Sequence, residues 1–332
     1  MTATSHSNDW GDLPSPYRIL PCAIPFLVPG FRKHASPTDR VLAPEPFDCE
    51  AWFDSFVDRV AAAIGRKFLP VCRMSDGEFL FLFGQQPPSL RLSPRLRLGQ
   101  RVRRVLGAIR HIGKGFQPTT APDVSSGDFS PKEWLDYRPV LARHYLDALD
   151  KGVLGLHLSY GAKPFQEHYF PAVRRWIDDA GRQLTLQNYL PFYCVYAMLR
   201  GPRMRHLAAG RRLLVVHSAI GCKRVAIIAA LREIGFRTVE WLTISPTRSF
   251  ADSLDLASIA EAPDMCLIGA GIGKARILAQ LEPLEVPCID AGYALEAWAD
   301  PDRQWDRPYM TPDAEFEIGR IRFTPTTRRR GP

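Results

Sequence analysis

The stretch Phe68-Leu-Pro-Val-Cys-Arg-Met-Ser-Asp-Gly-Glu78 sets a short apolar run directly before an acidic turn, and a second apolar run, Phe79-Leu-Phe-Leu-Phe83, follows. A short apolar run bounded by turn residues predicts a buried strand. Acidic residues enclosed by such runs are seldom idle surface residues. The stretch therefore predicts a buried strand that ends at a functional loop.

The same pattern returns four times in the second half of the chain. Each apolar run there ends at small or polar residues, and the runs are Leu213–Val216, Thr238–Ile244, Met265–Ile268 and Val286–Ile289. Strands that alternate with helices predict a parallel sheet covered on both faces. We therefore expect an α/β fold with a Rossmann-like, mostly parallel sheet, plus helical N-terminal and middle segments. Ligands of such sheets bind at the carboxyl ends of the strands.

Helical periodicity marks further elements in the first two thirds of the chain. Apolar spacing predicts a helix over Phe47–Ile64 with Asp48 as its N-cap. A second helix is expected over Pro131–Leu149. The pattern then predicts a strand at Gly152–Leu158 and mostly helical structure over 164–210, interrupted at Asn188–Pro191.

The 332 residues are enough for one large or two ordinary domains. We expect a partly disordered N-terminal extension at 1–45, one domain over 46–305 and a C-terminal tail over 306–332. No apolar run approaches the length of a membrane-spanning helix. The first residues are polar and acidic, unlike a signal peptide.

The seven cysteines show no CxxC spacing, their number is odd, and most lie in apolar runs. Cysteine in such runs behaves as a small hydrophobic residue. This usage favours a reducing, cytoplasmic location and disfavours a zinc site.

The net charge of +8 is concentrated in one segment. Between Glu78 and Asp123 there is no acidic residue, whereas eight lysines and arginines occur there. Apolar residues at helical spacing predict a basic amphipathic helix within about 91–115. Three interpretations remain open: a solvated helix face, contact with a phosphate-bearing substrate, or peripheral contact with an anionic membrane at its inner face. No nucleic-acid partner is expected, because aromatic residues do not interleave with the charges.

The two carboxylates of the acidic turn suggest a metal site. Alternate residues of an extended chain point the same way and lie about 6.6 Å apart, so Asp76 and Glu78 could converge on one hard cation. Gly77 would let a ligand approach the backbone, and Arg73 would suit a diphosphate. The plain alternative is an Asp-Gly turn and a surface ion pair.

Three further groups follow strand ends. The turn Gly269-Ala-Gly271-Ile-Gly-Lys274 is neither a Walker A loop nor GxGxxG, and it fits either phosphate contact at a helix start or a tight turn. Asp290 could accept a sugar hydroxyl or cap the following helix. His217 flanks another strand-to-helix turn, with the same two interpretations.

Three segments of the chain resemble one known family. Arg73-Met-Ser-Asp-Gly-Glu78 is similar to the R-x-G-D-G-E signature of the bacterial GT-D-type glycosyltransferases, which carry a D-x-E metal motif. Cys266–Gly271 and Ile289-Asp-Ala-Gly-Tyr293 resemble the family's Gly-rich turn and its I-D-x-G-H segment. The resemblance spans roughly 66–300. Ser75 replaces a glycine of the signature and Tyr293 replaces its histidine.

The resemblance implies a metal-dependent glycosyltransferase that uses a nucleotide-sugar donor, a UDP-sugar foremost, and a divalent cation, Mn²⁺ or Mg²⁺. It implies a hydroxyl acceptor on a glycan, a lipid or a protein, as in surface polysaccharide or glycoconjugate synthesis. The alternative is a non-catalytic nucleotide- or phosphosugar-binding module of an envelope assembly complex. A methyltransferase or dehydrogenase is disfavoured by the incomplete glycine fingerprint.

The resemblance also implies roles for particular residues. Asp76 and Glu78 would hold the metal and, with Asp290, form the catalytic set. Asp290 would lie near the sugar or the acceptor, and the candidates for a general base are Asp290, His217 and Glu296. Arg73 would bind the diphosphate or orient Asp76, and the remaining donor-binding residues would be Gly77, His217, Gly269, Gly271 and Lys274.

Overall fold

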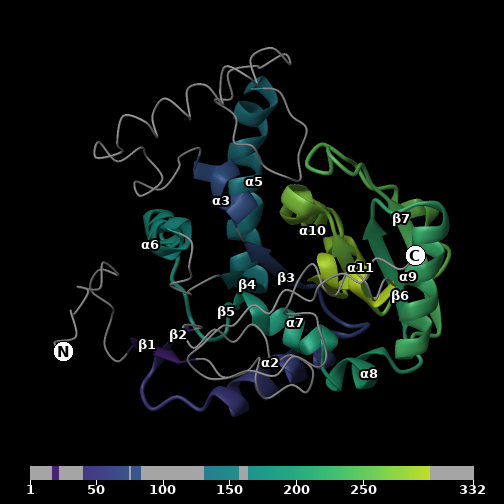
Figure 1. Ribbon diagram of the computed structural model, residues 1–332, viewed down its shortest axis with the longest axis horizontal. Helices are drawn as coiled ribbons and strands as arrows, with labels where there is room; N and C mark the ends of the chain where they lie inside the picture. Colours follow the sequence, from purple (N-terminus) through teal and green to yellow (C-terminus); the bar gives the residue numbers. More distant parts are fainter. Residues whose placement is uncertain (1–16, 22–39, 75, 84–130, 157–163, 300–332) are drawn as a thin grey trace, which may run out of the picture.

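The computed structural model describes residues 17–21, 40–74, 76–83, 131–156 and 164–299 (Figure 1). The basic segment at about 91–115 and the tail at 306–332 lie outside these residues, so the predictions for them stay predictions. Among the described helices, none combines the length and the apolar character needed to cross a bilayer.

The described residues build a seven-stranded, all-parallel sheet with the strand order β5-β4-β3-β9-β8-β6-β7. Most of its strand residues are buried, which is why the strands appear in the sequence as continuous apolar runs. The predicted parallel sheet is therefore confirmed. Its strands are β3 (Leu69–Met74), β4 (Val153–Leu156), β5 (Tyr189–Pro191), β6 (Arg212–His217), β7 (Thr238–Thr243), β8 (Met265–Gly269) and β9 (Pro287–Asp290).

Helices cover both faces of this sheet. The helix α5 (Pro131–Lys151) packs on β3 and β4 and against α3 (Asp76–Phe83) and α10 (Lys274–Gln280). Figure 1 shows α3, α5 and α10 on one side of β3 and β4, with α7 and α8 on the other. The remaining helices include α2 (Cys49–Ala63), α6 (Pro164–Asp179), α7 (Phe192–Arg200), α8 (Arg203–Ala208), α9 (Gly221–Ile234) and α11 (Tyr293–Ala299).

The strand order explains the two layers. The connections from β3 to β4 and from β8 to β9 run toward one edge of the sheet, and the connection from β6 to β7 runs toward the other. Right-handed crossovers in opposite directions put their helices on opposite faces. At β6 and β8 the connections therefore diverge, and a crevice for ligands opens outside the carboxyl ends of strands at such a point.

Two strands form a separate small sheet, and one of them contacts the edge strand β5 of the main sheet. The strands β1 (Tyr17–Pro21) and β2 (Arg40–Pro44) pair antiparallel, and Val41 and Ala43 on β2 are buried. Part of the expected extension at 1–45 thus forms regular structure.

The predicted N-cap of α2 is confirmed, and the predicted interruption near residue 190 is a strand. The side chain of Asp48 accepts hydrogen bonds from the backbone N–H groups of Glu50 and Ala51 at 3.0 Å, as an N-cap does. The predicted interruption at Asn188–Pro191 is more than a break, because it contains β5, the edge strand of the sheet. A three-residue strand is too short to show a period of its own.

Candidate functional site

Arg73 and Asp290 meet at the carboxyl ends of two adjacent strands. Val71 on β3 pairs with Ile289 on β9, so the residues just beyond them end side by side. Arg73 donates from Nη2 to Oδ1 of Asp290 at 3.1 Å and from Nε to Oδ2 at 3.2 Å, and its backbone N–H lies 3.3 Å from Oδ2. Both side chains are 2% exposed. This bidentate pair joins two segments that are 217 residues apart in the sequence.

Lys274 connects the same pair to the acidic turn. Its Nζ lies 2.9 Å from Oε1 of Glu78 and 3.3 Å from Oδ2 of Asp290. Lys274 is the first residue of α10 and Glu78 is the third residue of α3, so two helix starts and two strand ends contribute to one cluster. We call Arg73, Glu78, Lys274 and Asp290 the buried quartet. Its formal charges, two positive and two negative, cancel.

The electrostatics of the buried quartet keep Asp290 and Lys274 charged. Burial acts to raise the pKa of Asp290, but the charges of Arg73 and Lys274 outweigh it and hold that pKa below the ordinary value. Burial likewise acts to lower the pKa of Lys274, and the charges of Asp290 and Glu78 outweigh it and raise that pKa. Asp290 is therefore ionised and Lys274 protonated at neutral pH.

Aromatic rings and glycines enclose the guanidinium group of Arg73. Its Cζ lies 3.9 Å from the ring centroid of Tyr196 and 4.8 Å from that of Phe192, which gives cation–π contacts on α7. Gly292 has a φ of 48°, and a Cβ there would collide with Nη2 of Arg73. At Gly155 an added Cβ would lie 3.0 Å from Cγ of Arg73. The glycine of the Ile-Asp-Ala-Gly segment is thus required by close packing as well as by backbone conformation.

The expected backbone at the acidic turn was wrong. The strand β3 ends at Met74 and α3 begins at Asp76, so Asp76 and Glu78 lie in the first turn of a helix and not on an extended chain. Residues two apart on a helix do not face each other. Gly77 is the second residue of α3. The side chain of Asp76 lies outside the described part of the structure, and its assignment to a metal stays a prediction.

The chemistry of Glu78 nevertheless fits a divalent cation. Among the described side chains, no group of three or more His, Cys, Asp or Glu residues is arranged to hold a metal ion. The ammonium group of Lys274, however, lies between the carboxylates of Glu78 and Asp290, so these oxygens already hold a cation. Carboxylate oxygens are the ligands that Mg²⁺ and Mn²⁺ prefer. Glu78 is the described residue that would hold such an ion, with Asp76 as its expected partner.

A second polar cluster lies where the connections of β6 and β8 diverge. Nε2 of His217 lies 3.8 Å from Oε1 of Glu296, and Nζ of Lys223 lies 2.5 Å from the same oxygen. Nδ1 of His217 accepts the backbone N–H of Ala219 at 2.9 Å, so the proton of the neutral ring is on Nε2 and faces Glu296. Burial, with the charge of Lys223, lowers the pKa of His217 to about 4.

The three candidates for a general base, Asp290, His217 and Glu296, differ in how fully their polar atoms are engaged and in how accessible they are. Asp290 has both oxygens engaged by cations, and His217 has its only unprotonated nitrogen engaged by a backbone N–H. Glu296 is 15% exposed and is the most accessible of the three.

Close packing requires glycine at two positions of the turn that runs from Gly269 to Lys274. A Cβ at Gly269 would collide with Cδ2 of His217, and a Cβ at Gly273 would collide with the backbone at Ser249 and Phe250. Gly271 has a φ of 51°. Lys274, which the sequence suggested for a phosphate, points to the carboxylates of the buried quartet.

Two residues that stack on Arg73 of the buried quartet were not identified from the sequence. Phe192 and Tyr196 are spaced i, i+4 in an apolar helix, which is also the pattern of ordinary core residues. No local signal distinguishes an aromatic residue that stacks on a buried arginine from one that packs on leucine.

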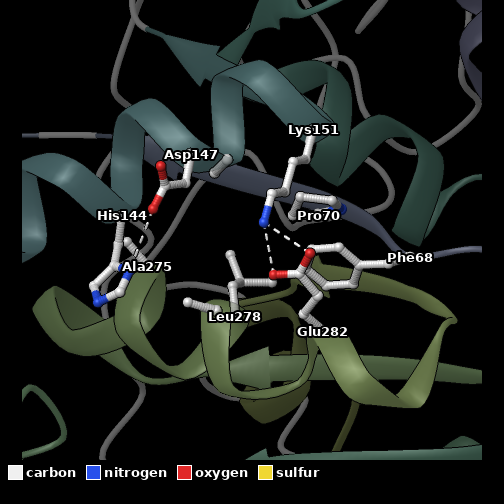
Figure 2. A pocket seen from close by; sticks show the side chains of 10 residues that line it. Phe68, Pro70, His144, Asp147, Lys151, Ala275, Leu278 and Glu282 are labelled. Atoms are coloured by element: carbon white, nitrogen blue, oxygen red, sulfur yellow. Dashed lines mark hydrogen bonds and ion pairs between the residues drawn. The ribbon is translucent and has the colours of Figure 1, made fainter.

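A small pocket lies at the opposite end of β3. It is formed between α5 and α10, and Figure 2 shows the pairs Lys151–Glu282 and His144–Asp147 at its sides. Its volume is about 30 Å³. This is room for water molecules, whereas ligand sites measure hundreds of Å³. The pocket is not a candidate for a sugar or nucleotide site.

Comparison with known proteins gives few matches. No protein-family model matches the chain, and no curated protein matches it. A solved structure described as "The highly conserved domain of unknown function 1792 has a distinct glycosyltransferase fold" is 13% identical to this chain, with a TM-score of 0.41. The alignment covers 82% of this chain and 91% of that chain.

Proposed function

We propose that this protein is a metal-dependent glycosyltransferase that moves a sugar from a nucleotide-sugar donor to a hydroxyl acceptor. One observation supports this above the others: the Arg73–Asp290 ion pair brings two of the three sequence segments that resemble the GT-D-type family into contact. Both segments lie at the carboxyl ends of parallel strands, where ligands of such sheets bind.

The described side chains suggest a division of roles. The leaving group of the reaction is a nucleoside diphosphate, and a divalent ion, when bound, would neutralise its developing charge. Glu78 would hold that ion together with Asp76. Arg73 is buried against Asp290, so we assign it to positioning Asp290 and the β9 end and not to direct contact with the diphosphate.

A base for the acceptor hydroxyl is assigned to the second cluster. Glu296 is a carboxylate of α11 beside His217, the last residue of β6, and the Nε2–H of His217 and the ammonium group of Lys223 face one of its oxygens. In this proposal Glu296 takes the proton of the acceptor hydroxyl. His217, whose ring is neutral at pH 7, acts as a positioning residue for Glu296.

The proposal is tested by turnover of a donor. The full chain is incubated with UDP-, GDP- and dTDP-sugars, with and without Mn²⁺, and the released nucleoside diphosphate is measured. Glu78→Gln should lower metal-dependent turnover by about 100-fold. Glu282→Gln, which changes an exposed glutamate paired with Lys151, is the matched control and should leave turnover unchanged.

Two results would count against the proposal. Full metal-dependent turnover of Glu78→Gln would remove the assigned role of Glu78. Binding of a nucleotide sugar with no transfer or hydrolysis for any donor would favour the non-catalytic binding module. A thermal-shift panel separates binding from turnover, because only ligands of the native state raise its stability.

A further inference from the structure

The position of Lys274 in the buried quartet is unusual for a residue at a glycine turn. In a Walker A loop the lysine that follows the glycine turn reaches the phosphates of the ligand. Here the side chain is 8% exposed and runs to Glu78 and Asp290. The ammonium group thus occupies the space between two carboxylates that come from different elements, α3 and β9.

A divalent cation cannot bind at Glu78 unless the ammonium group of Lys274 moves away or loses its charge. The four charges of the buried quartet cancel, so a divalent ion at Glu78 would add positive charge directly beside the ammonium group of Lys274. Nζ of Lys274 lies only 2.9 Å from the oxygen that the metal would approach. Two cations that share one carboxylate oxygen repel each other, and the repulsion is strong at a buried place.

If a metal took Glu78, Asp290 would be the one carboxylate of the buried quartet left for both Lys274 and Arg73. Asp290 is already bound in a bidentate manner by Arg73 and is 2% exposed. Arg73 is itself held by Tyr196 and Phe192 and has no room to withdraw. Of the two cations in the quartet, Lys274 is therefore the one that a metal would displace, because a flexible stem carries its charge.

We propose that Lys274 is a built-in counter-ion that competes with a divalent cation for Glu78. The inference rests on the metal assignment of the proposed function, and it adds a regulation of that site. Without metal, the ammonium group neutralises Glu78 and keeps the start of α3 joined to β9. Metal binding releases the ammonium group from Glu78, so the affinity for metal is lower than the carboxylates alone would give.

The test measures metal binding without any donor. Free Mn²⁺ is titrated into the full chain and followed by its electron paramagnetic resonance signal. Lys274→Met should lower the Kd for Mn²⁺ at least tenfold, since the competing charge is gone. Lys274→Arg keeps the charge and should stay within about threefold of the wild type. Adding Glu78→Gln to Lys274→Met should abolish the gain.

Each result decides the inference independently of catalysis. A Kd of Lys274→Met equal to or weaker than that of the wild type overturns it, and so does a lack of Mn²⁺ binding by all of these proteins. If Lys274→Met does not fold, Lys274→Gln replaces it, because its amide is uncharged and can still donate to Glu78. A tighter Kd without turnover of any donor would support this inference and reject the transferase.

Discussion

Removal of the Asp290 carboxylate should be among the most destabilising single changes at the strand ends. Asp290→Ala leaves two buried cations, Arg73 and Lys274, without the anion that they share. Breaking a buried ion pair by removal of one partner costs about 3–5 kcal/mol, because the other charge stays buried and unpaired. Lys274 keeps Glu78, whereas Arg73 loses its carboxylate, so we expect a loss of about 4 kcal/mol.

The assay is urea unfolding at neutral pH, followed by tryptophan fluorescence. The free energy of unfolding is extrapolated to water for the wild type and for the variant, and the slope of the transition is compared to verify that both unfold alike. The control is Glu282→Ala, which breaks the ion pair of Lys151 and Glu282, where the two side chains are 46% and 44% exposed. Such a pair contributes about 0–1 kcal/mol.

The reasoning would be refuted by a small effect. If Asp290→Ala lost no more stability than Glu282→Ala, the quartet would not be a buried, dry network. Asp290→Asn refines the test, because the amide retains a hydrogen-bond acceptor and loses only the charge. Because the folded pKa of Asp290 is depressed, its contribution is present above the unfolded value of 3.8 and is lost as the pH falls below it. The wild type should therefore lose its advantage over Asp290→Asn in acid.

Three other predictions concern stability and are measured by the same unfolding assay. The pKa of His217 falls from 6.5 to about 4 on folding, so the unfolded state takes up the proton first as the pH falls. The free energy of unfolding of the wild type should therefore drop by about 3 kcal/mol relative to His217→Gln between pH 6.5 and pH 4, and parallel pH curves for the two proteins would contradict this. Gly292→Ala should lower the free energy of unfolding by at least about 1 kcal/mol more than Gly181→Ala, because both glycines have a positive φ but only at Gly292 does the new Cβ meet Arg73. Equal losses of stability would show that backbone strain alone matters. Asp48→Ala should cost about 1 kcal/mol by removal of the α2 cap, and an unchanged midpoint would refute that role.

The sequence was sufficient for the regular elements of the sheet. Buried parallel strands must be apolar on both faces, so β3, β6, β8 and β9 are visible as short apolar runs. The Asp48 cap was predictable for a similar reason, because the bond spans three residues and depends on local geometry alone. The edge strand β5 was not predictable as a strand, since three residues carry no period.

The candidate site was predictable as a set of residues and not as an arrangement. Arg73, Glu78, Lys274 and Asp290 each stand near a turn that follows an apolar run, and this made each of them a candidate. The pairing of these four charges with one another was not predicted. The sequence suggested that Arg73 would meet Asp76 or a diphosphate, and the structure pairs it with Asp290.

The physical reason is the sequence separation over which each interaction acts. Strand, helix and cap depend on neighbours within a few residues, so the sequence by itself determined the parallel α/β sheet and the strand-end position of the polar residues. The strand order β3-β9-β8 is decided only when distant segments pack, and it brings Asp290 beside Arg73 across 217 residues. Tertiary structure alone therefore determined which charges neutralise one another, because a buried charge must take the partner that packing places next to it.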